Sequence, residues 1–217
     1  MAIPLQTSMP EVYTVAGDSA EIFGDTYRAD VNMAVWQRAV SPALNAECDA
    51  LLKEGRFRGC SLSLPTSQLS TLSEAEPVLT AYPALSSDIQ LLADMFSLLF
   101  ELDAVGLRLT PLSGKMCPKF HTDNVACRLV TSYSGPGTQW LPHHCVDRSK
   151  LGAGSRGLSD ADSGLYPAAS DINTLQTHHV ALLKGENWEG NEGAGLVHRS
   201  PAVAPGQQRL LLTLDFL

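Results

Sequence analysis

Apolar and polar residues follow two different periods along the chain. In the first half, segments 41–55 and 86–103 repeat apolar positions at helical spacing. In the first segment Ser41 can cap the helix, Pro42 suits the first helical position and Gly55 can end it. In the second, a Ser/Asp start precedes apolar residues on one face: Ile89, Leu92, Ala93, Phe96 and Leu99. The pattern therefore predicts two amphipathic helices.

From residue 104 onward, apolar and polar positions alternate with the period of two that is typical of β-strands. Strands are expected at 104–112, 119–123, 127–133, 138–142, 178–185, 195–201 and 208–217. Between 146 and 177 the chain is rich in Gly, Ser and Asp, and loops of that length inside a domain are usually functional lids or disordered. The first 25 or so residues are expected to be irregular.

Helices followed by roughly eight strands indicate an α+β fold in which the helices cover a β-sandwich or barrel. We therefore expect one domain over 1–217, with a helical part at 1–103 and a β-barrel core at 104–217. The last strand supports this, because one of its faces is wholly apolar and needs cover. That face carries Leu210, Leu212, Leu214 and Phe216. The opposite face mixes charge with apolar residues: Arg209, Leu211, Thr213 and Asp215.

Composition and charge exclude several classes of function. The net charge is −8 and no basic stripe is present, which argues against a nucleic-acid partner. No apolar run approaches the length that spans a bilayer, and the start of the chain does not resemble a secretory signal. We expect a cytoplasmic protein without a membrane partner. The five cysteines include no C-x-x-C pair and predict free thiols rather than a disulfide framework.

A histidine and an aspartate lie two residues apart in the predicted strand 119–123. Residues i and i+2 of a strand project from one face, so His121 and Asp123 would point together. His198, on a later predicted strand, is the best candidate for a third ligand. Two histidines and one carboxylate on one side of a metal leave other coordination positions open, as in non-haem Fe(II) oxygenases. An H-x-D pair alone is also common among unrelated polar side chains of strands.

Arg209, on the polar face of the last strand, would face the same cavity as the metal ligands. A guanidinium there can bind a carboxylate through two parallel hydrogen bonds. Asp215 shares that face and is an alternative partner, but six residues of straight strand separate the two Cα atoms by roughly 20 Å. A carboxylate ligand therefore suits Arg209 better than Asp215 does.

The ordered set of His121-x-Asp123, "RLVTSYSGPGTQWLP" and "VHRSPAVAPGQQRLLLTLDF" resembles the Fe(II)- and 2-oxoglutarate-dependent dioxygenases, particularly the prolyl-hydroxylase-like members. This resemblance covers about residues 104–217 and implies a double-stranded β-helix, a jelly-roll-like barrel with helical cover. The whole chain also resembles an uncharacterised bacterial domain family with the signatures "HTDN…R…Y.GPGT.WL" and "LLKGE.W…G..HRSP". Members of that family often occur beside zinc-homeostasis genes, and no activity is assigned to it.

Carried over to this chain, the resemblance implies Fe(II) held by His121, Asp123 and His198. Arg209 would bind the distal carboxylate of 2-oxoglutarate. Further contacts to this cosubstrate are expected from Arg128, Thr131 and Tyr133. The implied reaction couples decarboxylation of 2-oxoglutarate to oxidation of a C–H bond in an unidentified small molecule or protein side chain. The "HRSP" and "KGENW" stretches have no counterpart with a known role.

Three other interpretations remain open from the residues alone. A zinc site could combine Cys117, His143 or His144, and Cys145, although their spacing matches no standard zinc motif. A protein of the same fold could also bind metal without catalysis, in zinc homeostasis for example, but it would not need Arg209 as a carboxylate clamp. Trp140 and Trp188 could line a substrate pocket or belong to the core.

Overall fold

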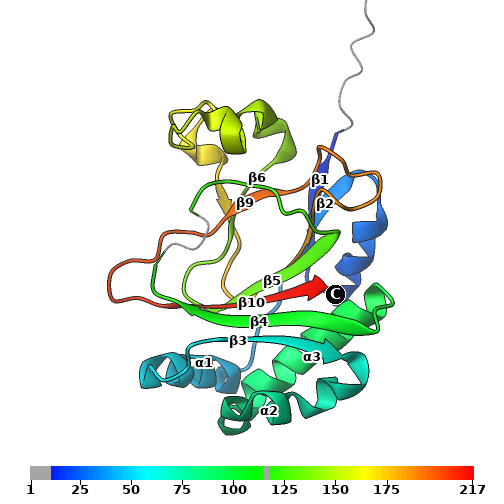
Figure 1. Ribbon diagram of the computed structural model, residues 1–217, viewed down its shortest axis with the longest axis vertical. Helices are drawn as coiled ribbons and strands as arrows, with labels where there is room; N and C mark the ends of the chain where they lie inside the picture. Colours follow the sequence, from blue (N-terminus) through cyan, green and yellow to red (C-terminus); the bar gives the residue numbers. More distant parts are fainter. Residues whose placement is uncertain (1–10, 115–117) are drawn as a thin grey trace, which may run out of the picture.

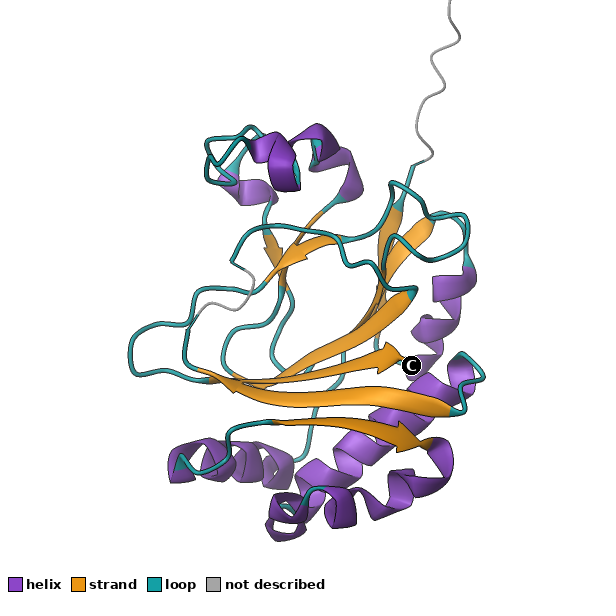
Figure 2. Cartoon of the chain, in the orientation of Figure 1, coloured by secondary structure: helices purple, strands orange, loops and turns teal. Residues whose placement is uncertain are grey.

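A large β-sheet separates a layer of helices from a second, smaller sheet in the computed structural model (Figures 1 and 2). The structure describes residues 11–114 and 118–217. The large sheet has seven strands in the order β1-β2-β8-β5-β10-β4-β3, and the small one has three in the order β7-β6-β9. Neighbouring strands are antiparallel except for the parallel pair β1 and β2.

The large sheet consists of β1 Tyr13–Gly17, β2 Val31–Trp36, β3 Cys60–Pro65, β4 Ala104–Leu112, β5 Cys127–Ser134, β8 Val180–Lys184 and β10 Arg209–Phe216. The small sheet consists of β6 Gln139–Leu141, β7 Asn173–Thr174 and β9 Val197–Arg199. The α-helices are α1 Pro42–Glu54, α2 Leu72–Ala75 and α3 Pro83–Leu99. Short 3₁₀ helices occupy Ala20–Tyr27, Thr66–Thr71, Pro77–Ala81, His143–Cys145, Arg148–Lys150, Gly152–Ser155 and Ala169–Asp171.

Both predicted helices are present, and the first has the predicted ends. The Ser41 hydroxyl accepts a hydrogen bond from the Leu44 amide, and Gly55 closes α1 in the left-handed conformation at φ 63°. The second helix begins three residues earlier than expected, at Pro83. Pro83 suits a first helical position, and the Leu85 amide finds an acceptor in the Glu47 carboxylate of α1 at 2.9 Å.

The expectation of a helical part at 1–103 is wrong in one respect, because this part also supplies β1, β2 and β3. These strands form the two edges of the large sheet, with β2 beside β1. Strand β2 has no alternating pattern because both of its faces are buried: Ala34 packs with the helices, and Met33 and Val35 pack toward the small sheet.

The strand expected at 119–123 is absent, and only His121 forms an isolated bridge there. The strand pairs of the described part of the chain form two facing sheets rather than one closed ring. The segment 146–177 is compact, although the sequence suggested a long loop. It folds into short 3₁₀ helices and β7, and Leu165 within it packs against Phe120, Leu141 and Val197. In Figure 1 it lies above β6 and β9.

The predicted division of the last strand into two faces is confirmed. Leu210, Leu212 and Leu214 of β10 are fully buried against the helical layer, in one core with Ile89, Leu92 and Phe96 of α3. The opposite face looks toward the small sheet, where Leu211 belongs to a second core. No helix in the described ranges is long and apolar enough to cross a membrane.

Replacing Leu212 with aspartate is expected to lower the free energy of unfolding by several kcal/mol, because the side chain is fully buried among apolar residues. The same substitution at Leu158, a leucine that is 50% exposed, is expected to change it by less than about 1 kcal/mol. Urea unfolding followed by circular dichroism measures both. Equal stabilities of the two variants would contradict this packing.

Candidate functional site

His121, Asp123 and His198 come together where the β9 edge of the small sheet faces the large sheet. Nε2 of His121 lies 3.5 Å from one carboxylate oxygen of Asp123, and Nε2 of His198 lies 3.4 Å from the other. One ligand atom from each residue lies within 4.8 Å of the other two. In residues 11–114 and 118–217 this is the one cluster of three or more such side chains with metal-binding spacing.

Both imidazole rings are oriented by backbone carbonyls. Nδ1 of His121 lies 2.9 Å from the Lys119 carbonyl oxygen, and Nδ1 of His198 lies 3.1 Å from that of Leu196. A carbonyl only accepts, so each Nδ1 carries a proton, and Nε2 is the ring nitrogen that faces Asp123 and would be offered to a metal. This is the arrangement in which histidines commonly bind metals.

The backbones of the two histidines are joined directly. The His121 amide donates to the His198 carbonyl at 3.0 Å, and the His198 amide donates to the His121 carbonyl at 2.9 Å. The carboxylate of Asp160 strengthens this link from the 146–177 segment. It accepts from the Phe120 amide at 3.0 Å and from Arg199 at 3.1 Å, the two residues that flank the histidines. Arg199 also lies over the Phe120 ring.

Asp123 reaches the site from a loop, and strand pleating does not explain its position. The turn after β8 holds this loop through backbone hydrogen bonds from Glu186 to the Asp123 carbonyl at 2.9 Å and from Gly185 to the Ala126 carbonyl at 3.0 Å. At Gly185 a Cβ atom would lie 2.1 Å from the Val125 carbonyl oxygen. The "KGENW" stretch therefore packs against the Asp123 loop.

Arg128 of β5 connects Asp123 to the large sheet. It donates to Asp123 at 2.6 Å and to both carboxylate oxygens of Asp215 on β10, at 2.7 and 3.0 Å. Burial opposes ionisation of Asp123, but its bonds to His121 and His198 and the charge of Arg128 hold the pKa of its carboxyl well below the usual range. Asp123 is therefore ionised at neutral pH.

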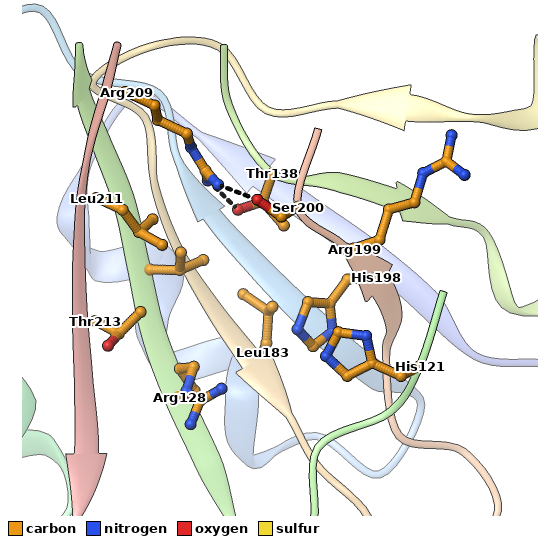
Figure 3. Close-up of a pocket in the computed structure, with 11 residues that line it drawn as sticks. His121, Arg128, Thr138, Leu183, His198, Arg199, Ser200, Arg209, Leu211 and Thr213 are labelled. Atoms are coloured by element: carbon orange, nitrogen blue, oxygen red, sulfur yellow. Dashed lines mark hydrogen bonds between the residues drawn. The ribbon is translucent and has the colours of Figure 1, made fainter. Parts of the chain in front are cut away.

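A cavity of about 70 Å³ extends from the two histidines to Arg209 (Figure 3). This volume accommodates several water molecules at about 10–15 Å³ each. Arg209 lies at one end of the cavity and the histidines at the other, with Leu183 and Leu211 between them (Figure 3). Its remaining lining comes from Arg128, Val130, Thr138, Arg199, Ser200 and Thr213.

Arg209 is almost fully buried, with 1% of its surface exposed. Its guanidinium donates to the hydroxyls of Ser132 at 3.0 Å, Ser200 at 3.0 Å and Thr138 at 2.8 Å. Burial lowers the pKa of Arg209 to about 10, which leaves it charged at neutral pH. Throughout the described chain no carboxylate pairs with it, since Asp215 binds Arg128 and Arg108 instead. A buried cation whose partners are all neutral favours an anionic ligand.

Two residues expected at this cavity lie on the opposite face of the large sheet. Thr131 and Tyr133 alternate along β5 with Arg128, Val130 and Ser132, so they point toward the helices. The Tyr133 hydroxyl donates to Asp88 of α3 at 2.7 Å. The prediction that Thr131 or Tyr133 helps Arg209 is therefore wrong, and the hydroxyls of Ser132, Thr138 and Ser200 occupy that role.

The tryptophans and the described candidate zinc ligands lie away from this cavity. Trp140 packs at the edge of the core between the sheets, and Trp188 packs against Tyr27 and Phe100. A 3₁₀ helix directly before the 146–177 segment carries His143, His144 and Cys145. Cys117 lies outside the described residues. The described members of the alternative zinc set do not form a ligand cluster.

Sequence reasoning missed Asp160 and Arg199, and it considered Asp215 only as a partner of Arg209, whereas Asp215 binds Arg128. The "HRSP" motif carried a signal for one of them, because each of its first three residues has a contact at the site: His198 faces Asp123, Arg199 binds Asp160 and Ser200 accepts from Arg209. No feature of the sequence pointed to Asp160, because it lies in a segment without helical or strand periodicity.

Comparison with known proteins gives a family and a fold. A family model described as "Protein of unknown function (DUF1826)" matches residues 17–215. No curated protein matches the chain. The chain is similar to the solved structure of dioxygenase for auxin oxidation 1 from Arabidopsis thaliana in its 2-oxoglutarate complex, with 11% identity, a TM-score of 0.50 and coverage of 95% of this chain and 92% of that one. It is also similar to the rice dioxygenase for auxin oxidation, with 12% identity, a TM-score of 0.51 and coverage of 95% and 83%.

Replacing Gly185 with alanine is expected to displace the Asp123 loop, because the added methyl group would overlap the Val125 carbonyl. The expected cost in the free energy of unfolding is about 1–3 kcal/mol, as for other overpacking substitutions. Gly24→Ala is the matched control, since no atom lies within 4 Å of the position of its Cβ. Thermal and urea unfolding measure the difference, and equal stabilities would show that the loop is not tightly held.

Proposed function

This chain belongs to the DUF1826 family, and we propose that it is an Fe(II)- and 2-oxoglutarate-dependent oxygenase. The observation that carries the proposal is that one cavity has a candidate metal site at one end and a buried arginine at the other. At one end stand two imidazole Nε2 atoms and a carboxylate, and at the other stands a buried guanidinium without a carboxylate partner in the described chain.

The donor set of His121, Asp123 and His198 fits a divalent metal that prefers nitrogen and oxygen ligands. Two imidazoles and one carboxylate on one side of the metal match the facial arrangement of non-haem Fe(II) oxygenases. Both rings present Nε2 because their Nδ1 atoms are held by backbone carbonyls. The ionised Asp123 supplies the negative charge that a cation requires there.

Arg209 suits the distal carboxylate of 2-oxoglutarate. Its three hydroxyl partners come from β5 and from the ends of β6 and β9, so they hold the guanidinium at a fixed orientation. The apolar side chains of Val130, Leu183 and Leu211 line the path between Arg209 and the histidines. Such a lining excludes water around the aliphatic part of a dicarboxylate and strengthens the charge pair at its end.

When bound, Fe(II) and 2-oxoglutarate would activate O₂, which is the oxidant, and the overall reaction would convert R–H, O₂ and 2-oxoglutarate into R–OH, succinate and CO₂. The chain itself would hold the metal through His121, Asp123 and His198 and would orient the cosubstrate through Arg209, with apolar side chains lining the path between them. The substrate R–H is a small molecule or a protein side chain.

The arrangement of strands supports the same proposal. We infer that the two facing sheets are the halves of a double-stranded β-helix whose helices cover the outer face of the large sheet. The two dioxygenases with TM-scores of 0.50 and 0.51 have an overall fold similar to that of this chain, and the Arabidopsis thaliana enzyme was solved as a complex with 2-oxoglutarate.

Metal binding tests the first half of the proposal. His121→Ala, Asp123→Ala and His198→Ala are each expected to abolish tight binding of Mn(II) or Co(II), because two ligands rarely hold such ions. Anaerobic calorimetry on the purified protein measures the affinity. His144→Ala is the control, as this histidine is exposed and lies outside the site. Undiminished binding by the His198 variant would remove the third ligand and with it the proposed centre.

Cosubstrate binding tests the second half. Arg209→Met is expected to leave metal affinity unchanged and to weaken 2-oxoglutarate binding roughly 30-fold or more, since a lost buried charge pair costs about 2–5 kcal/mol. Arg58→Met, at an exposed arginine, is the matched control. Calorimetry on the anaerobic Mn(II)-loaded protein measures both. A parent protein that binds metal but has no affinity for millimolar 2-oxoglutarate would be a metal-binding protein rather than this oxygenase.

A further inference from the structure

We propose that Arg128, held by Asp215, is a positioning residue that limits Asp123 to one metal-coordinating oxygen. This inference rests on the proposed metal centre and adds a requirement for cosubstrate binding. A carboxylate that coordinates through both oxygens fills two positions on a metal. A carboxylate with one oxygen engaged elsewhere fills one, which leaves room for a bidentate ligand.

The orientation of Arg128 is determined by a cross-strand pair. Arg128 of β5 and Asp215 of β10 are direct register partners, so their side chains emerge side by side on the cavity face. Nε and Nη2 of the guanidinium donate to the two oxygens of Asp215, at 2.7 and 3.0 Å. This two-point contact fixes the plane of the guanidinium, because Arg and carboxylate groups match in shape.

The remaining nitrogen then points at the metal-binding carboxylate. Nη1 of Arg128 donates to Oδ2 of Asp123 at 2.6 Å. The other oxygen, Oδ1, is the one nearer to His121, at 3.5 Å. Asp123 is largely buried, with 15% of its side chain exposed, so water does not readily replace Arg128 at Oδ2. Arg128 therefore competes with the metal for one oxygen and leaves Oδ1 available.

Arg108 provides an internal comparison within the same network. It also donates to Asp215, at 3.2 Å, but its side chain is 56% exposed, and this hydrogen bond goes to Asp215 rather than to Asp123. Loss of Arg108 removes one cation from Asp215 without changing the hydrogen bonding of Asp123. Arg108→Gln is therefore the matched control for Arg128→Gln.

The test compares Co(II)-loaded proteins under anaerobic conditions, with the absorption spectrum of Co(II) and the affinity for 2-oxoglutarate as readouts. Arg128→Gln is expected to retain Co(II) binding but to change the visible spectrum, because Asp123 can then coordinate through both oxygens. Its affinity for 2-oxoglutarate is expected to fall about 10- to 100-fold, an effect as large as the loss of metal affinity or activity that usually follows removal of a residue that orients a metal ligand. Arg108→Gln is expected to match the parent protein in both readouts.

Two further variants separate positioning from folding. Asp215→Asn leaves Arg128 in place but weakens its two-point contact, so a smaller change in the same direction is expected. The double variant Arg128→Gln with Asp215→Asn removes both charges of the pair and any cost of an unpaired buried carboxylate. If the pair is only structural, the double variant restores the parent spectrum and affinity. If Arg128 positions Asp123, both defects persist.

The outcomes distinguish this inference from the proposed function. A folded Arg128→Gln protein with the parent spectrum and parent affinity for 2-oxoglutarate overturns the positioning role and leaves the oxygenase proposal intact. A parent protein that binds Co(II) but not 2-oxoglutarate overturns the oxygenase proposal, and the spectrum alone then decides the role of Arg128. A parent protein that does not bind Co(II) overturns both.

Discussion

Two reciprocal backbone hydrogen bonds between His121 and His198 hold the candidate site together. They join segments that are far apart in the sequence, and they bring the two ring centroids to 4.7 Å. The neighbouring residues reinforce the bridge, because Asp160 binds both Phe120 and Arg199. The folded 146–177 segment is therefore part of the support of the site.

The two faces of the large sheet have different environments. One face is apolar and is covered by α1 and α3, and the other carries charged residues at chosen positions of β5 and β10. These charged residues differ in whether a residue of opposite charge neutralises them. Arg128 and Asp215 neutralise each other, whereas Arg209 has only the hydroxyls of Ser132, Thr138 and Ser200 among the described residues. These two arginines therefore differ in charge balance. Arg128 is neutralised by a carboxylate, and Arg209 at the far end of the cavity is not.

Close approach of backbone segments explains two glycines near the site. At Gly137 a Cβ atom would lie 1.9 Å from the Leu175 carbonyl oxygen, and at Gly185 one would lie 2.1 Å from that of Val125. The first approach packs the loop before β6 against the chain near β7, next to Thr138. The second packs the turn after β8 against the loop that carries Asp123. Glycine is therefore needed at both positions for close backbone packing around the site.

The sequence by itself determined the elements whose local pattern is strong. Ser41, Pro42 and Gly55 marked the ends of α1, and the alternation of β10 assigned Leu212 to the core and Arg209 to the cavity. These features follow from hydrogen bonding and periodicity over a few residues, so they can be recognised locally. Strand β2 was missed because burial of both faces removes the alternation. Strand β3 was missed although Leu62 and Leu64 alternate with serines in it.

Only the tertiary structure decided how the site is assembled. His121 and Asp123 were expected together because of strand pleating, but a loop held by Gly185 and Glu186 brings them together instead. Tyr133 was expected beside Arg209, yet the alternation of β5 gave that place to Ser132. Most of the partners of Arg128, Arg199 and Arg209 come from strands and loops distant in sequence, among them Asp215, Asp160 and Ser132. Such partners depend on register between strands and on loop packing, and a single sequence read locally contains neither.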